Sequence, residues 1–435
     1  DISVPDSVRL LSEVLTRFKT LRAFELYGAQ LGDGDVGTIV QALTGHSSLT
    51  KVDLSGTTVG ERGLAALAAL INSPNSSLVD LDLRRCHLND EEALILAPAL
   101  GRNSVLKKLN IACNGDITIT GWRAVFAQLQ SRRSSLDNLL LWGNSIDDAT
   151  ANLLANALAN GSHLKALNLG RSSHITTEGW RAFFEGLSSP RCVLQELLLH
   201  SNEFNDEDVT YLSSCLANNI TLCHLDLRCS TEVTSSGWRE FSAVLQNPNS
   251  ALEKVELGHI SINDELLVSL ANSLVHNSKL KELELILDVD AEEDITMITR
   301  WDALSDVLCN KTSINATFYS NHTLQGIFDP DEIEESVMPS DLRSLLQLNR
   351  ENTKIEAARR KILQCHFSGS DISIQPFIAM DLNALPHAIA WMARDEHGSS
   401  LLYTFARNTT LFVGIGGVTK TEGEPNSKRQ KMYAG

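Results

Sequence analysis

A six-residue motif, Leu-x-x-Leu-x-Leu, returns in fixed phase through most of this 435-residue chain. Successive copies lie 28 to 30 residues apart, and several carry a conservative substitution at one apolar site. The first residues of the ten clear copies are Leu21, Leu49, Leu78, Leu106, Leu136, Leu164, Leu194, Leu222, Leu252 and Leu280. A degraded eleventh copy is expected to begin at Ile314. Such regularity is not a chance result, so the chain is predicted to be one repeat array rather than a row of separate domains.

The rest of each repeat has room for a whole helix, and two kinds of helix alternate. One kind begins with acidic or amide residues and carries an apolar face, in residues 90–100, 148–158, 206–216 and 264–274. The other kind begins with Gly-Trp-Arg, and its tryptophans, Trp122, Trp180 and Trp238, are each 58 residues apart. The true unit is therefore a pair of repeats.

Each recurring polar or aromatic group in these helices has two interpretations. The acidic clusters could hold a hard metal ion, but a helix start is where carboxylate and amide oxygens cap free N–H groups, and we interpret them as caps. The tryptophans could form a peptide-binding ridge, but we expect them to fill the wedge between adjacent helices. Arg123, Arg181 and Arg239 would then lie at the surface.

Geometry predicts the shape of such an array. Parallel strands stack about 4.8 Å apart, whereas packed helices need about 8–10 Å. Joining one strand and one helix in every repeat therefore forces curvature, with a parallel sheet inside and helices outside. The ends of the array need caps, and residues 7–18 have the apolar spacing of an N-terminal capping helix.

The strands, together with Asn or Cys three positions after them at Cys86, Asn114, Asn144 and Asn202, resemble the ribonuclease-inhibitor-like leucine-rich repeats. The resemblance covers residues 21–320. It implies an α/β fold, a leucine-rich repeat solenoid in the form of a horseshoe. Members of that class are mainly protein-binding scaffolds, including ribonuclease inhibitors, Ran GTPase-activating proteins and sensor domains of immune receptors.

Beyond the repeats we expect a small, mostly helical C-terminal module. A solvated acidic linker, with the sequence Asp-Pro-Asp-Glu-Ile-Glu-Glu at 329–335, would precede it. The expected divisions are an N-terminal capping helix at 1–20, about eleven repeats at 21–325, the linker at 326–339, the module at 340–413 and a disordered tail at 414–435.

The charge of the chain excludes several kinds of partner. The net charge is −17 and the isoelectric point is about 5.1. Nucleic acid and anionic membranes need clustered Lys and Arg, so neither is expected as the main partner, and no apolar run approaches the length of a membrane span. No small-molecule substrate is evident. A protein partner remains, and a basic one is compatible with this charge.

No motif indicates catalysis, a cofactor or a metal. The eight cysteines form no CxxC pair and are expected to be reduced. Residues 414–421 fall short of a phosphate-binding loop, because Thr419 stands where the pattern needs Gly. Reduced thiols and the lack of an apolar leader favour an intracellular, cytoplasmic protein. The short basic run Lys428-Arg429-Gln430-Lys431 would allow nuclear import.

The concave face of the sheet is the best candidate site. In each strand the residue between the last two leucines should point to that face, because strand side chains alternate. We expect an apolar anchor at its centre, from Leu140, Trp142, Leu198 and His200. Acids on either side would steer a basic partner, with two arginines on the same face: Glu25, Asp53, Asp82, Asp226, Glu256 and Glu284, with Arg84 and Arg228. The alternative is that these residues only keep the face hydrated, with Trp142 covered by a neighbour.

The favoured function is a non-enzymatic scaffold that binds a protein or an extended peptide in the concave face. One alternative is a regulator of a small GTPase, by similarity to Ran GTPase-activating proteins. Another is a sensor or substrate-adaptor arm of a longer protein. An active site within 340–413 has no support from residue spacing.

Overall fold

The computed structural model describes residues 4–18, 20–257, 264–285, 301–327 and 338–366. The chain divides into two compact units. The first comprises Asp1–Leu308 with Asn321–Glu351, and the second comprises Cys309–Ser320 with Asn352–Gly435.

Within the described part of the first unit, ten short strands form one parallel sheet in the order of the sequence. The strands are β1 (Ala23–Glu25), β2 (Lys51–Asp53), β3 (Asp80–Asp82), β4 (Lys108–Asn110), β5 (Asn138–Leu140), β6 (Ala166–Asn168), β7 (Glu196–Leu198), β8 (His224–Asp226), β9 (Lys254–Glu256) and β10 (Glu282–Glu284). Each strand coincides with one of the ten predicted motif copies. The fold predicted from the repeat is therefore confirmed.

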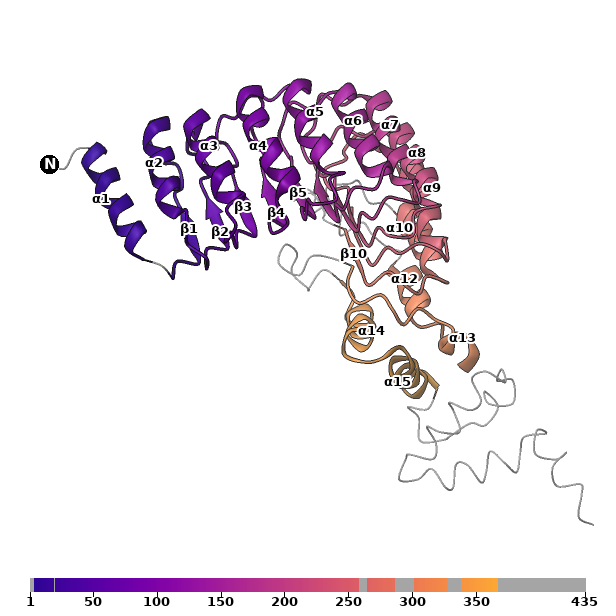
Figure 1. Ribbon diagram of the computed structural model, residues 1–435. Helices are drawn as coiled ribbons and strands as arrows, with labels where there is room; N and C mark the ends of the chain where they lie inside the picture. Colours follow the sequence, from indigo (N-terminus) through magenta and orange to yellow (C-terminus); the bar gives the residue numbers. More distant parts are fainter. Residues whose placement is uncertain (1–3, 19, 258–263, 286–300, 328–337, 367–435) are drawn as a thin grey trace, which may run out of the picture. The chain divides into compact units, whose positions relative to one another are not determined.

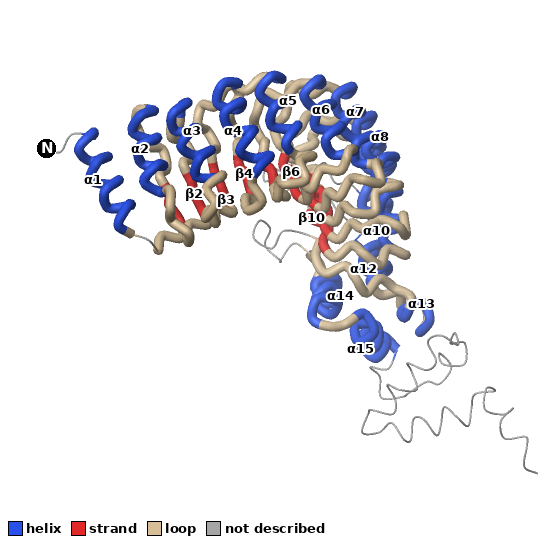
Figure 2. The backbone as a smooth tube through the Cα atoms, viewed as in Figure 1, coloured by secondary structure: helices blue, strands red, loops and turns tan. Residues whose placement is uncertain are grey.

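Helices of the first unit lie on the outer side of this sheet, as the ribbon and the tube both show (Figures 1 and 2). They are α1 (Val4–Arg17), α2 (Asp33–Leu43), α3 (Gly60–Ile71), α4 (Asp90–Arg102), α5 (Ile119–Gln128), α6 (Asp148–Ala159), α7 (Thr177–Leu187), α8 (Asp206–Leu216), α9 (Ser235–Gln246), α10 (Asp264–Leu274) and α12 (Trp301–Leu308). The first unit also contains α14 (Ser340–Glu351), which follows the last strand. The second unit contains α13 (Ile314–Phe318) and α15 (Lys354–His366). We call the sheet face that points away from the helices the concave face.

The core lies between the sheet and these helices. The middle residue of each strand is the second leucine of the motif or its substitute, and Leu81, Leu139 and Leu197 are all fully buried. The tryptophans of the Gly-Trp-Arg helices are at most 2 % exposed, so their predicted packing role is confirmed. Trp180 packs among three phenylalanines, with its ring 4.9 Å from that of Phe204.

Buried asparagines close the turns that follow the strands. The Oδ1 atom of Asn114 accepts hydrogen bonds from the N–H groups of Cys86 and Leu88 in the preceding repeat, and its Nδ2 donates to the Leu83 carbonyl. Asn144 and Asn202 repeat part of this pattern. A buried polar group is stable only when it is hydrogen-bonded, which explains why the motif carries asparagine there.

The polar residues at the helix starts cap their own helix and the helix of the next repeat, through different side chains. Asn89 caps its own helix α4, through a bond from the Glu91 N–H. Asp90, one residue later, instead accepts hydrogen bonds from the Thr118 and Gly121 N–H groups at the start of α5. In the same way Asp148 accepts the Thr176 N–H and Asp206 accepts the Thr234 N–H, each from a residue 28 positions later, in the next repeat. The predicted capping role is confirmed for α4, α6 and α8, and it extends across repeats.

The eleventh copy expected at Ile314 is wrong, because Ile314–Phe318 is the helix α13. The edge of β10 is instead covered by Gly326, which forms a β-bridge with Glu282, while Leu283 donates its N–H to the Gly326 carbonyl. The equivalent of the first motif leucine is then Leu324, which is 44 residues after Leu280. An insertion in this repeat broke the period on which the prediction relied.

The compact units do not follow the boundary expected at residue 340. Helix α14 belongs to the first unit, where Asn349 donates hydrogen bonds to the Asn321 and Leu324 carbonyls. Most of the expected linker, residues 367–413 of the expected module, the tail at 414–435 and the basic run at 428–431 lie outside the described residues. No helix in the described part of the chain is long and apolar enough to cross a membrane.

Candidate functional site

The strand register brings the predicted concave residues into one row, which we call the central column. Each member is directly opposite the next on the neighbouring strand, so Leu140 lies between Asn110 and Asn168, and Leu198 between Asn168 and Asp226. From β1 to β10 the central column is Glu25, Asp53, Asp82, Asn110, Leu140, Asn168, Leu198, Asp226, Glu256 and Glu284.

Most polar members of this column have a structural task that the sequence analysis missed. The Oδ1 atom of Asp82 accepts the N–H of Arg84, two residues later, at 2.9 Å. Asn168 accepts the Gly170 N–H at the same distance, and equivalent bonds are made by Asp53, Asn110 and Asp226. Asp and Asn are the residues that close such turns with their own side chains. Their presence in the column therefore does not by itself indicate binding.

Two leucines interrupt this pattern. Leu140 and Leu198 occupy the same register as Asn110 and Asn168 but cannot accept a hydrogen bond, and both are only half-buried. Trp142, two residues beyond Leu140, is also half-buried. We call Leu140, Trp142, Leu198 and His200 the apolar patch. The structure places Leu140 on β5 and Leu198 on β7, with Trp142 and His200 two residues after them, and β6 lies between the two strands.

The His200 ring lies against the turn that follows the preceding strand, β6, because the residue there is Gly170. A Cβ atom built on Gly170 would be 2.5 Å from Cε1 and 2.6 Å from Nε2 of the His200 ring. Burial lowers the pKa of His200 below its ordinary 6.5, although the nearby Asp226 carboxylate opposes that shift. The ring is therefore neutral at pH 7 and adds to the apolar character of the patch.

At the C-terminal end the predicted steering acids form a closed group of charges, which we call the charge network. The Arg228 guanidinium contacts Asp226 at 2.9 Å and Glu256 at 2.7 Å, and Lys254 Nζ contacts Glu256 at 3.0 Å and Glu284 at 2.7 Å. His224 Nε2 lies 2.7 Å from Glu256 Oε1.

The steering role predicted for Asp226 and Glu256 is not compatible with this arrangement. Asp226 is 0 % exposed and Glu256 is 4 % exposed. Burial alone would raise the pKa of Glu256. Hydrogen bonds from His224 and Lys254 and the charge of Arg228 outweigh burial and lower this pKa to about 2. These carboxylates are neutralised by their own neighbours, and Arg228 is a partner within the network rather than a free cation.

The N-terminal acids are more open. Glu25 is exposed and contacts Lys51 Nζ at 2.6 Å. Asp53 and Asp82 are half-buried, and the second oxygen of Asp82 accepts a bond from Asn110 Nδ2. Arg84 is half-buried beside them. Tyr27, which the predicted site omitted although it stands at the outer end of the first strand, is 71 % exposed and extends this region.

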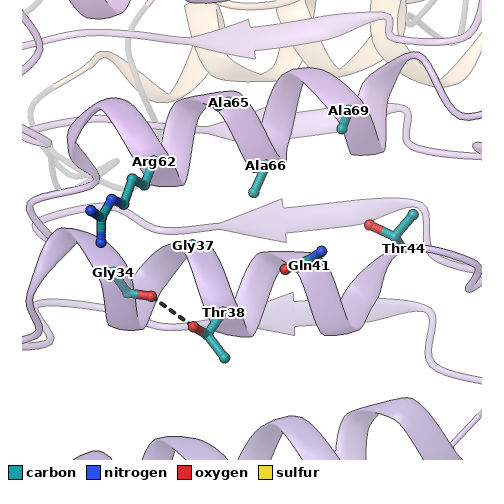
Figure 3. Close-up of a pocket in the computed structure, with 9 residues that line it drawn as sticks. All are labelled: Gly34, Gly37, Thr38, Gln41, Thr44, Arg62, Ala65, Ala66 and Ala69. Carbon is teal, nitrogen blue, oxygen red and sulfur yellow. Dashed lines mark hydrogen bonds between the residues drawn. The ribbon is translucent and has the colours of Figure 1, made fainter.

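A hollow lies on the helix side of the sheet, between α2 and α3 (Figure 3). Its volume is about 720 Å³, and its lining is mostly Gly, Ala and Thr with Arg62 at one end. The Thr38 hydroxyl donates to the Gly34 carbonyl at 2.7 Å, so that polar group is already satisfied. Among the described residues, no group of three or more His, Cys, Asp or Glu could hold a metal ion.

The parallel sheet, the outer helices and the buried asparagine turns define the class of this chain: it is a leucine-rich repeat protein. A family model described as "Leucine Rich repeat" matches residues 45–68. The chain is 29 % identical over 268 residues to "NACHT, LRR and PYD domains-containing protein 14" of Mus musculus, covering 62 % of this chain and 26 % of the relative.

Two further relatives also match more than half of this chain but only a small part of their own length. "NACHT, LRR and PYD domains-containing protein 3" of Mus musculus is 27 % identical over 249 residues, covering 57 % of this chain and 24 % of the relative. "Tonsoku-like protein" of Bos taurus is 30 % identical over 283 residues, covering 63 % and 20 %. The chain thus spans about a quarter or less of the length of these relatives.

Among solved structures, "Leiomodin-1 Actin-Binding Site 2 (ABS2)" aligns with 36 % of this chain and 87 % of its own. The identity is 21 % and the TM-score is 0.31, so this likeness carries no conclusion about the present chain.

Proposed function

We propose that this leucine-rich repeat protein is a non-enzymatic scaffold that holds a protein or an extended peptide on its concave face. Leucine-rich repeats of this kind are protein-interaction modules. The apolar patch would provide the anchor, and the partner would run across the strands on either side of it.

The observation that carries the proposal is the exchange of turn-closing Asp or Asn for leucine at two places. Asn110 and Asn168 show what the fold favours at this register, since each accepts a backbone N–H two residues later. Leu140 and Leu198 give up that bond and leave apolar surface half-exposed beside Trp142. Fully burying such a side chain is favourable by about 1.5–3 kcal/mol, so covering the exposed part of a half-buried one contributes part of that amount. Aromatic anchors at the centre of an interface often dominate binding.

The charges around the patch suggest where a basic partner group would lie. The charge network already satisfies the acids of β8 to β10. Glu25, Asp53 and Asp82 remain accessible on β1 to β3. We therefore place the apolar residue of the partner at the patch and its Lys or Arg toward the N-terminal strands.

The decisive variant replaces the two leucines with the residue that the fold prefers. In Leu140→Asn/Leu198→Asn each new amide can close its turn as Asn168 does, so thermal stability should be kept or raised. Partners captured by the wild-type protein should be lost. Affinity capture followed by mass spectrometry, with unfolding temperatures measured in parallel, would show both effects.

The matched control is Asn168→Leu, on the strand between the two leucines. It removes the bond to the Gly170 N–H, which should cost about 0.5–1.5 kcal/mol of stability, but it keeps the apolar patch intact. Partners should be retained by this less stable variant. Loss of partners with Asn168→Leu but not with the double variant would contradict the proposal.

The curated relatives carry their matched segment within a much longer chain. A role as the binding arm of a longer protein is compatible with the proposed surface. The same variants, placed in the full gene product, would test it, because the arm would lose its partner while the other activities of the protein persist.

A further inference from the structure

Two thiols meet in the second unit. Cys309, which directly follows α12 in the chain, has its Sγ 3.3 Å from the Sγ of Cys365 in α15, although the residues are 56 apart in sequence. A disulfide bond is about 2.05 Å long, so a movement of roughly 1.3 Å would join the two sulfur atoms. Two other thiols donate to backbone carbonyls, Cys86 to that of Leu54 and Cys223 to that of Thr221.

The two thiols differ in their access to solvent. Cys309 is fully buried, and Cys365 is half-buried. Burial, with the contact to Cys365, raises the pKa of Cys309 to about 12, and the Lys361 amine acts in the opposite direction. A buried protonated thiol reacts slowly with an oxidant from solution, since the thiolate is the nucleophile. An oxidant from solution would therefore reach the Cys365 sulfur first, and the Cys309 thiol lies next to it.

We propose that Cys309 and Cys365 form a peroxide-sensitive dithiol that closes into an intramolecular disulfide. In the first step the Cys365 thiolate attacks one oxygen of hydrogen peroxide. The O–O bond breaks, two electrons pass from sulfur to the peroxide, and the products are a Cys365 sulfenic acid and, after protonation, water.

In the second step Cys309 attacks the oxidised sulfur. The S–S bond forms as the S–O bond breaks, and the hydroxyl group leaves as water with the Cys309 proton. A dithiol reductant returns both residues to thiols. The product would tie the segment before α13 to α15 within the second unit, and closing a loop of this size constrains the unfolded chain.

The test uses the full chain, reduced and then exposed to graded hydrogen peroxide. Remaining thiols are alkylated, the protein is digested without reduction, and mass spectrometry identifies linked peptides. We expect the Cys309–Cys365 pair to be the first disulfide to appear, to vanish on treatment with dithiothreitol and to raise the unfolding temperature of the oxidised protein by several degrees.

Variants separate the two roles and control for the fold. Cys309→Ala should leave Cys365 as a sulfenic acid that dimedone traps, whereas Cys365→Ala should leave Cys309 unmodified over the same time. Cys113→Ala, which removes a half-buried thiol elsewhere, should not change the formation of the disulfide. The wild-type peptide map does not depend on any variant folding.

Three results would overturn the proposal. One is a first disulfide between other cysteines. Another is oxidation of Cys113, Cys223 or Cys229 while Cys309 and Cys365 stay reduced. The third is trapping of sulfenic acid on Cys309 rather than Cys365 in the single variants.

Discussion

Gly170 has no side chain, and the ring of His200 occupies the space where a Cβ atom would be. This contact holds one member of the apolar patch in place from the neighbouring strand. A single methyl group at Gly170 would therefore displace one member of the patch, His200, without substituting any residue proposed to contact the partner.

We expect Gly170→Ala to displace the His200 ring, to cost about 1–3 kcal/mol of stability through overpacking and to weaken partner binding. Removing the ring first should relieve the crowding. The free energy of unfolding should thus fall less when Gly170→Ala is made in a His200→Ala background. Equal losses in the two backgrounds, measured by denaturant unfolding, would show that the ring is not what the methyl group meets.

A second prediction at the residue scale concerns Glu256 and the pH dependence of stability. Its pKa is about 2 in the folded chain, against an ordinary 4.5, so its ion pairs stabilise the fold fully above pH 4.5. That contribution is lost as the pH falls from about 4.5 toward 2. Between pH 6 and pH 3 the free energy of unfolding should fall by about 2 kcal/mol more in the wild type than in Glu256→Gln.

Denaturant unfolding at the two pH values checks this difference. Glu253→Gln is the control, because Glu253 forms an exposed pair with Lys281 and should behave as the wild type does. An identical pH dependence in wild type and Glu256→Gln would mean that the network does not hold Glu256 ionised.

At the scale of elements, three of the aspartates that cap the helix of the next repeat require a glycine in that helix. Asp90 accepts the Gly121 N–H at 2.9 Å, and a Cβ atom on Gly121 would lie 2.7 Å from the same carboxylate oxygen. Gly179 and Gly237 are in the same relation to Asp148 and Asp206. The glycine of the Gly-Trp-Arg triplet therefore makes room for a cap supplied by another repeat.

This geometry predicts a reversal of ordinary helix propensity. Alanine is the better helix former by about 1 kcal/mol, yet Gly121→Ala should destabilise the chain by about 1–3 kcal/mol. In an Asp90→Ala background the same substitution should cost less, with a coupling of at least about 0.5 kcal/mol. Additive losses in a double-mutant cycle would count against the shared cap.

The sequence motif predicted elements well wherever its period was intact. All ten strands lie where Leu-x-x-Leu-x-Leu places them, because burial of the middle residue fixes both position and register. Leu324 was missed because it follows an insertion. A better signal was available: Asn103, Asn277 and Asn321 each accept a backbone bond from the motif leucine three residues later.

The candidate site could be predicted only in part. Its column followed from strand alternation, but the compensation of Asp226 and Glu256 depends on how Arg228 and Lys254 reach across strands, which no spacing reveals. Likewise the contact of Cys309 with Cys365 joins residues 56 apart that belong to no motif.

At the scale of the whole molecule, the accessible acidic charge is concentrated at one end of the concave face. Substituting Asp53→Asn/Asp82→Asn removes two charges while each amide can still close its turn. If the captured partner is basic there, this variant should associate several-fold more slowly at low salt and show a weaker dependence on salt.

The control is Glu284→Gln, within the charge network, which should change the association rate little. Stopped-flow mixing at several salt concentrations measures both, and equal salt dependence in all three proteins would remove the steering role of the N-terminal acids.

The shared caps also constrain how an array of this kind can grow. Asp33 bonds to Gly63, and the pairs Asp90–Gly121, Asp148–Gly179 and Asp206–Gly237 continue the same alternation along the chain. Duplicating one repeat would set two helices of the same kind side by side and leave one of them without its donor or its acceptor. Duplicating 58 residues would preserve every cap. Chains descended from this pattern should therefore gain and lose repeats in even numbers.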